Sequence, residues 1–307
     1  MSAPVILSIE AYDYLAAEIA ARCGAATCRV ERATFPDGER HLRVADEVND
    51  RDVVLVGGTV SDSATLELYD LANAIVENGA ATLTLVVPWF GYSTAERAVK
   101  PGEAVVAKTR ARLLSSIPSA KLGNSILLLD LHSEGIPHYF EGAIHPVHVY
   151  AKPLIEEIAR QFGGDSFVLG STDAGRAKWV ESLAYDLGVP AAFVYKKRLS
   201  PTSTAVSAVT MSFSGETVVI YDDMIRSGTS LLNAARAYRD AGARRIAAVA
   251  THGVFPGDAL RRLQESGLFS DLACTDSHVN AHRLASSGTL LVRTVAPLFI
   301  QHLRRTQ

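Results

Sequence analysis

Short apolar runs alternate with amphipathic stretches along most of this chain. The apolar runs are rich in Val, Ile and Leu and predict strands at residues 53–56, 83–87, 126–129, 167–169, 192–195, 218–221 and 246–250. Apolar residues that recur every three or four positions predict helices at residues 64–77, 105–116, 151–161, 177–187 and 231–240. Strands that alternate with helices build βαβ units, so the pattern predicts an α/β fold with mainly parallel central sheets flanked by helices.

An internal repeat indicates two similar lobes. Residues 53–58 (VVLVGG) align with residues 218–223 (VVIYDD), and both copies continue through a helix to a Gly-containing turn and another apolar strand. We therefore expect one lobe at residues 1–150 and a second at residues 151–307. The last segment, about 290–307, is mostly apolar from 290 to 303 and is able to pack on either lobe, the N-terminal lobe included.

The clearest candidate chemistry lies at the end of the second copy, in Asp222, Asp223, Ser227, Gly228, Thr229 and Ser230. Ligands of parallel sheets bind beyond the carboxyl ends of the strands, which is where these residues fall. Backbone N–H groups at the start of a helix suit a phosphate, and the two carboxylates suit sugar hydroxyls or a metal-bound ligand. The pattern predicts a sugar-phosphate site. Only the C-terminal lobe retains it, because the first copy has Gly57-Gly58 in place of the two aspartates.

Three loops of the N-terminal half each allow two interpretations. The segment 35–39 (FPDGE) is either a charged turn or a site where Phe35 stacks on a base and carboxylates accept from its amino group. The aromatic segment 88–92 (PWFGY) fits the core or a ligand platform, and Arg97 beyond it is able to pair with phosphate oxygens. His132 is the last residue of the segment 130–132 (DLH). It is either a solvated or helix-capping residue or a residue of a functional site. His138, His145 and His148 lack the spacing of a zinc site.

Two loops of the C-terminal half are also ambiguous. Asp173 follows a predicted strand, where it would cap a helix or hold Mg²⁺ through water. The segment 196–198 (KKR) ends another strand and leads into a polar stretch, 199–204, without periodicity. It is either a solvated charged face or a mobile cationic lid that closes over phosphates.

Composition narrows the class of protein. The net charge of −3 over 307 residues argues against a nucleic-acid protein, which usually has a strongly basic face. Residues 1–10 lack a signal pattern and no apolar run has the length of a membrane span, so we expect a cytoplasmic protein without a membrane partner. Its 3 cysteines are an odd number without metal-like spacing, and they are expected to be reduced thiols.

Taken together, these segments resemble the ribose-phosphate pyrophosphokinase (phosphoribosyl diphosphate synthetase) family along nearly the whole chain. The resemblance rests on the ordered segments 35–39, 88–92, 130–132, 173–175, 196–198, 222–225, 251–255 and 295–298. It implies two lobes of the type I phosphoribosyltransferase fold. It also implies an activity of nucleotide biosynthesis, in which the β,γ-diphosphoryl group of ATP is transferred to O1 of ribose 5-phosphate and AMP is released.

The resemblance also implies a role for each matched residue. The ribose 5-phosphate site would comprise Asp222, Asp223, Ser227, Gly228, Thr229 and Ser230. The nucleotide site would comprise Phe35, Asp37, Glu39, Arg97 and His132, of which the first three would come from a neighbouring subunit, so a homo-oligomer built from dimers is implied. His132 and Asp173 would hold Mg²⁺. Lys196 and Arg198 would be the catalytic lid.

The chain departs from the commonest family pattern at several positions. Thr94-Ala95 stands where Arg-Gln is usual, and residues 94–97 with 102–103 look like the plant-type second class, which uses less selective donors and requires no inorganic phosphate. Arg226 stands where an aspartate is usual. Two alternatives stay open: a phosphoribosyltransferase, which shares the 222–230 segment, and a non-catalytic homologue that regulates a true synthetase.

Overall fold

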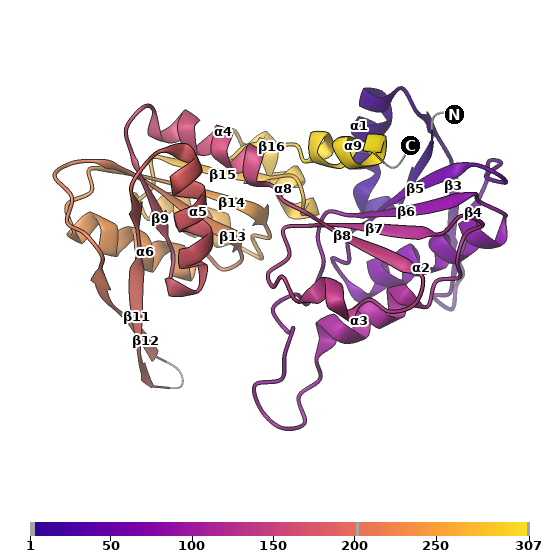
Figure 1. The fold of residues 1–307 in the computed structure, drawn as a ribbon, viewed down its shortest axis with the longest axis horizontal. Coiled ribbons are helices and arrows are strands. Elements are labelled where there is room, and N and C mark those ends of the chain that lie inside the picture. Colours follow the sequence, from indigo (N-terminus) through magenta and orange to yellow (C-terminus); the bar gives the residue numbers. More distant parts are fainter. Residues whose placement is uncertain (1–3, 201–202, 306–307) are drawn as a thin grey trace. The chain divides into compact units, whose positions relative to one another are not determined.

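The computed structural model describes residues 4–200 and 203–305 and confirms the predicted α/β fold (Figure 1). The chain divides into two compact units. Unit 1 contains the chain up to Tyr150 together with the segment from Val295, and unit 2 contains Ala151–Thr294. Each unit has its own six-stranded sheet, in which all neighbouring strands run parallel.

The helices and strands of unit 1 are, in chain order, β1 (Val5–Ser8), α1 (Asp13–Cys23), β2 (Ala26–Thr27), β3 (Val30–Thr34), β4 (Arg40–Val44), β5 (Asp52–Val56), α2 (Asp62–Glu77), β6 (Thr82–Val87), α3 (Val106–Ser115), β7 (Asn124–Leu129), β8 (Ile144–Val149) and α9 (Ala296–Arg305). Those of unit 2 are α4 (Lys152–Gly163), β9 (Val168–Ser171), α5 (Ala177–Leu187), β10 (Ala191–Ala192), β11 (Val194–Ser200), β12 (Ser203–Val209), β13 (Thr217–Ile225), α6 (Thr229–Asp240), β14 (Arg245–Gly253), α7 (Ala259–Glu265), β15 (Asp271–Thr275), α8 (Val279–Leu284) and β16 (Leu291–Arg293). Short 3₁₀ turns lie at Glu10–Tyr12, Ile136–Tyr139, Ala174–Arg176 and Ala285–Ser287.

The two units share one topology. Their strand orders are β2-β1-β5-β6-β7-β8 and β10-β9-β13-β14-β15-β16. In both sheets the strand that comes second along the chain, β2 or β10, lies at one edge beside the first, β1 or β9. The other four strands follow in chain order on the other side of the first. Each unit also has a separate antiparallel hairpin, β3–β4 or β11–β12, which comes after β2 or β10 in the chain and before the sheet continues with β5 or β13. This correspondence supports the duplication inferred from the sequence repeat, since β5 and β13 occupy the same place.

Both sheets are covered on two faces. The chain moves toward one edge of the unit 1 sheet from β1 to β2 and toward the other edge from β5 to β6 and β7. Because such crossovers are right-handed, α1 covers one face of this sheet and α2 and α3 cover the other. Figure 1 shows this arrangement, with α9 beside α1. In unit 2, α6 buries Leu231, Ala234, Ala235 and Tyr238 against the sheet. This spacing of three and four residues is the apolar stripe that predicted the helix.

The structure corrects the prediction for residues 192–204. The expected single strand at 192–195 is divided, because β10 ends at Ala192 and β11 begins at Val194. The stretch 199–204, expected to be an irregular loop, contributes to the hairpin β11–β12 wherever it is described. Thr204 and Val206 are β-branched and favour the extended backbone that pairs with β11.

Two further boundaries differ from expectation. Asp222 and Asp223 lie inside β13, since β14 continues beside it as far as the pair Ile225–Gly253. The final segment is shared between the units, because β16 completes the unit 2 sheet and α9 belongs to unit 1, where it packs on α1. The cysteines are free thiols as predicted, half-buried at Cys23 and buried at Cys28 and Cys274.

Candidate active site

The two adjacent aspartates of β13 lie at the carboxyl end of the unit 2 sheet, where Asp223 is buried and Asp222 is half-buried. β9 ends opposite Tyr221, so beyond that residue the loop after β9 covers this side of β13. Thr172 of that loop donates from Oγ1 to Asp222 Oδ2 at 2.9 Å. Burial and the neighbouring charge of Asp223 raise the pKa of Asp222 from 3.8 to about 8. The structure thus brings Asp222 and Asp223 together with the loop that carries Asp173.

Arg176 completes this cluster and was missed in the sequence. It lies in the 3₁₀ turn after β9 and forms a hydrogen-bonded ion pair with Asp223, whose side chain is 5% exposed. Its positive charge opposes the rise in the pKa of Asp222. The signal in the sequence was a basic residue three positions after Asp173, in a loop for which only a helix cap or a metal ligand was predicted. Asp173 Oδ1 accepts the N–H of Gly175 at 3.0 Å, so its carboxylate is held in the same loop.

The predicted phosphate loop joins β13 to α6. Gly228 is the residue before the helix and adopts φ +76°, the left-handed region that favours glycine. Ser227 Oγ lies 3.2 Å from Thr229 Oγ1 and 3.4 Å from the N–H of Thr229. Arg262 of α7 donates to the carbonyl oxygen of Ser227 at 2.9 Å and so ties the loop to α7. The exposed start of α6 therefore presents hydroxyl and N–H groups at one point.

The cationic segment lies on the hairpin of unit 2. Lys196 and Arg198 belong to β11, where their backbones pair with Val206 and Thr204. The side chains of residues 196–208 lie outside the described part of the structure. This hairpin occupies the same topological position in unit 2 that β3–β4 occupies in unit 1. The hairpin β3–β4 carries the segment 35–39.

The segment 35–39 is a tight turn, as predicted. The N–H of Phe35 donates to the carbonyl of Glu39 at 2.8 Å, and the N–H of Gly38 donates to the carbonyl of Phe35 at 2.9 Å. Gly38 has φ +92°, and Asp37 Oδ1 accepts the N–H of Glu39 at 3.1 Å. Phe35 is 51% exposed, and its ring lies in an edge-to-face arrangement with His41, with centroids 6.3 Å apart. The aromatic ring and the carboxylates of Asp37 and Glu39 are therefore presented together at the tip of the hairpin.

The loop after β7 carries His132 on a constrained backbone. Asp130 is buried and has φ +37°, which is unusual for a residue other than glycine. The N–H of Leu131 donates to Nε2 of His148 on β8 at 3.0 Å, so this imidazole acts as an acceptor. Burial lowers the pKa of His148, which favours the same neutral form. His132 itself is exposed. His148, dismissed as a zinc ligand, thus orders the loop that presents His132.

The aromatic segment after β6 is divided between core and surface. Trp89 and Phe90 are buried, so the core interpretation holds for them, whereas Tyr92 is 43% exposed and has φ +61°. Arg97 lies farther along the same connection, with its side chain 79% exposed and its Nε 3.5 Å from Glu96 Oε1. The guanidinium of Arg97 is therefore accessible to a solvent-borne anion.

Comparisons with known proteins cover both units. Residues 4–117 match the N-terminal domain of ribose phosphate pyrophosphokinase, and residues 173–304 match the phosphoribosyl synthetase-associated domain. The ribose-phosphate pyrophosphokinase of Chlorobaculum tepidum is 30% identical over 95% of this chain and 88% of its own length. That of Methanopyrus kandleri is 32% identical over 96% of this chain and 99% of its own length.

This chain belongs to the ribose-phosphate pyrophosphokinase family. The crystal structure of phosphoribosylpyrophosphate synthetase from Mycobacterium smegmatis matches it with a TM-score of 0.86 and 25% identity, over 100% of this chain and 99% of that one. The comparisons confirm the resemblance inferred from the motifs, the fold class and the prediction of an enzyme. In the described ranges, 4–200 and 203–305, no helix is both long and apolar enough to cross a bilayer.

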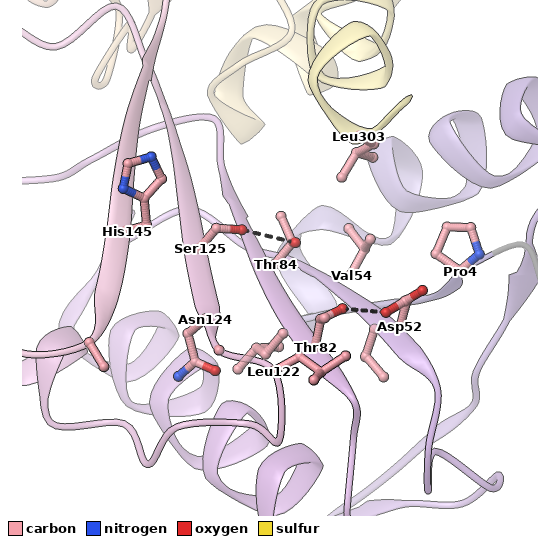
Figure 2. A pocket seen from close by; sticks show the side chains of 14 residues that line it. Pro4, Asp52, Val54, Thr82, Thr84, Leu122, Asn124, Ser125, His145 and Leu303 are labelled. Carbon is pink, nitrogen blue, oxygen red and sulfur yellow. Dashed lines mark hydrogen bonds between the residues drawn. The ribbon is translucent and has the colours of Figure 1, made fainter. Parts of the chain in front are cut away.

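A cavity of about 340 Å³ lies in unit 1, at the amino ends of β5 to β8 (Figure 2). Figure 2 shows Leu303 of α9 at its upper side, and two pairs of its polar side chains bonded to each other. Thr82 Oγ1 donates to Asp52 at 2.7 Å, and the hydroxyls of Thr84 and Ser125 lie 3.0 Å apart. The cavity is lined by none of the predicted site residues, which lie near or beyond the carboxyl ends of the strands or on the hairpins.

Proposed function

We propose that this protein transfers the β,γ-diphosphoryl group of ATP, or of another nucleoside triphosphate, to O1 of ribose 5-phosphate. The O1 oxygen forms a bond to the β-phosphorus, and the bond from that phosphorus to the α,β-bridging oxygen breaks. The nucleoside monophosphate departs with the bridging oxygen, and the O1 proton passes to solvent. The observation that carries the proposal is the pair Asp222 and Asp223 beside a Gly228-led helix start, in a chain whose two units both match the family.

The acceptor sugar phosphate would bind to unit 2. Asp222 and Asp223 would accept hydrogen bonds from ribose hydroxyls, and residues 227–230 would bind the 5-phosphate through hydroxyl and N–H groups. Arg176 supports this role because its guanidinium pairs with Asp223 and offsets the repulsion between the two neighbouring carboxylates. Arg226 is exposed beside the loop, and nothing in the structure explains its replacement of the usual aspartate.

The nucleotide would bind through residues of unit 1. Phe35 would stack on the base while Asp37 and Glu39 accept from its polar edge, and the exposed turn makes these groups available to a neighbouring subunit of a homo-oligomer. Arg97 and His132 would contact phosphate oxygens. The accessibility of both side chains supports this assignment.

The residues present fit a Mg²⁺ ion that is bound mainly by nucleotide phosphates. Within residues 4–200 and 203–305, no cluster of three or more His, Cys, Asp or Glu residues has the geometry of a metal site. Mg²⁺ in nucleotide enzymes commonly takes one or two protein ligands and otherwise binds phosphate and water. His132 and Asp173, each of which follows a strand, would be those ligands. The ion would neutralise charge on the phosphates.

Lys196 and Arg198 would supply the positive charge that the transferring phosphoryl oxygens need. Catalysis of this kind consists of positioning and charge neutralisation, without a covalent enzyme intermediate. The place of both residues on an extended hairpin supports a lid that approaches the phosphates from outside the sheet. Thr94 and Ala95, at positions where the family usually has Arg and Gln, support a second proposal: a relaxed choice of nucleotide donor and no requirement for inorganic phosphate.

One assay tests the function. Purified protein is incubated with Mg-ATP and ribose 5-phosphate, and AMP is followed with and without inorganic phosphate. We expect AMP in both cases, and also with GTP or CTP giving the corresponding monophosphate. Absence of AMP under every condition would support the regulatory homologue instead, and consumption of added phosphoribosyl diphosphate with a free base would support a phosphoribosyltransferase. A Lys196→Ala variant is expected to lose turnover yet to bind ribose 5-phosphate in calorimetric titration.

A further inference from the structure

The hairpin that presents Phe35 has little packing of its own. β3 and β4 form a two-stranded sheet separate from the six-stranded sheet of unit 1. Every residue of both strands is half-buried or exposed. An isolated two-stranded hairpin is marginally stable in water at best. Side-chain contacts with the rest of unit 1 must therefore hold this hairpin in place.

A single buried carboxylate receives hydrogen bonds from both strands of the hairpin. Glu67 lies on α2, and its side chain is 5% exposed. Arg32 of β3 donates from Nε to Glu67 Oε1 at 2.8 Å, and Arg40 of β4 donates to Oε2 at 2.8 Å. The N–H of Glu10, just after β1, also donates to Oε1 at 3.1 Å, and Arg32 bonds the carbonyl of Ser8 at 2.6 Å. One carboxylate thus joins both strands of the hairpin to α2 and to the end of β1.

Electrostatics keep this carboxylate ionised. Burial alone would raise the pKa of Glu67, but the hydrogen bonds from Arg32, from the Glu10 backbone and from Arg40 lower that pKa below its usual value. A buried carboxylate that accepts three donors, two of them guanidinium groups, has a strongly preferred geometry. The two arginines cannot both keep their distances unless the hairpin keeps its position.

We infer that Glu67 is a positioning residue for nucleotide binding. Arg40 directly follows Glu39, and Arg32 is separated from Phe35 by only Ala33 and Thr34, so displacement of either arginine moves the turn. Loss of a stacking contact between an aromatic side chain and a base weakens binding by about 5-fold to 150-fold. The inference rests on the proposed role of the turn in contacting the nucleotide. It adds a residue that touches no substrate and sets where that turn lies.

Kinetics of full-length variants test the inference. In Glu67→Gln, the amide nitrogen faces one arginine without accepting from it, so the turn loses its fixed position and we expect the KM for ATP to rise about 10-fold to 100-fold. The kcat at saturating ATP and the KM for ribose 5-phosphate should stay within about twofold of the parent. Glu31→Gln is the matched control, because it removes an exposed pair of the same hairpin, Glu31 Oε2 to Arg43 at 2.6 Å. The control should leave all three parameters unchanged.

Hydrogen–deuterium exchange gives a second readout that needs no nucleotide. In Glu67→Gln, amide exchange should accelerate across residues 30–44, including Phe35 and Gly38, while the interior of α2 stays protected. Should Glu67→Gln fail to fold, Arg40→Met keeps the Arg32 bond and serves for both measurements. Unchanged exchange in the hairpin, or an unchanged KM for ATP, would overturn the inference.

A Phe35→Ala variant separates this inference from the function on which it rests. A raised KM for ATP in Phe35→Ala, with no effect of Glu67→Gln, would reject Glu67 as a positioning residue and leave the nucleotide site intact. An unchanged KM for ATP in Phe35→Ala would reject the nucleotide role of the turn itself, and the inference with it. A raised KM in both variants, with faster exchange in Glu67→Gln, supports both.

Discussion

Removal of the Arg176 guanidinium should destabilise unit 2 in a manner that depends on pH. In the folded protein this cation pairs with Asp223, whose side chain is 5% exposed, and it opposes the high pKa of Asp222. An Arg176→Met substitution keeps most of the side-chain volume and deletes only the charge and its hydrogen bonds. The neighbouring carboxylates then face each other in a buried position without that cation.

The size of the effect follows from the number of negative charges. Removing one partner from a buried ion pair costs about 3–5 kcal/mol, and Arg176 is itself mostly buried at 18% exposure. At pH 9, above the raised pKa of Asp222, the parent holds two ionised carboxylates beside Arg176. The variant has to keep both charges without that cation or take up a proton, so we expect a loss of about 4 kcal/mol in the free energy of unfolding. At pH 6 the pair holds one proton, so the remaining repulsion is smaller and the expected loss is about 2 kcal/mol.

Trp179 provides a local probe for this measurement. Its ring stacks on Tyr221, beside Asp222, with centroids 4.2 Å apart. The chain has 2 tryptophans, so a Trp89→Phe background makes the fluorescence specific for unit 2. Urea unfolding is followed at pH 9 and at pH 6 in this background. Arg261→Met is the control, because Arg261 is 66% exposed and its ion pair with Asp258 should contribute less than about 1 kcal/mol.

Two results would contradict this reasoning. A loss equal at both pH values would mean that the charge of the carboxylate pair is not what Arg176 balances. A loss no larger than that of the Arg261→Met control would mean that the buried pair contributes nothing beyond an exposed one. Arg176→Lys should recover part of the stability at pH 9, because it restores the charge without the paired geometry of a guanidinium.

Three further outcomes are expected. The native pKa of Asp222 is raised above its unfolded value of 3.8, so the native state binds more protons and stability falls as pH rises from about 4 to about 8. An Asp222→Asn variant should flatten this dependence on pH, as measured by the midpoint of urea unfolding across the range. A dependence unchanged from the parent would contradict the raised pKa. Gly228→Val places a side chain at φ +76° and within 2.9 Å of Leu263, so we expect the free energy of unfolding to fall by about 2 kcal/mol. Calorimetry should also show weaker binding of ribose 5-phosphate, and a normal affinity would argue against a phosphate loop at this position. Tyr238→Phe removes a buried hydroxyl that lies 2.9 Å from each of two carbonyl oxygens on β9 and β10, which should cost about 1–3 kcal/mol in thermal or urea unfolding, with the fold preserved by circular dichroism.

Local patterns in the sequence determined most of the regular structure and the family. The apolar runs located β5, β6, β7, β13 and β14 to within a few residues, because a buried parallel strand requires consecutive apolar side chains. The turn at 35–39 was also readable, since short-range backbone conformation depends on neighbouring residue types. The motifs at strand ends then sufficed for the resemblance that the comparisons confirm.

Only the tertiary structure decided which side chains meet. The Asp223–Arg176 pair joins residues 47 positions apart, and the Arg32–Glu67 pair joins residues 35 positions apart. Strand order brings such partners together, and hydrophobic periodicity carries no information about that order, because every βαβ unit shares the same pattern. The same limit applies to the hairpin β11–β12, because the sequence between the paired residues Val194 and Val209 has no periodicity that marks the pairing. The sequence therefore specified the chemical groups of the site, and the packing of the sheets specified the charges that hold them in place.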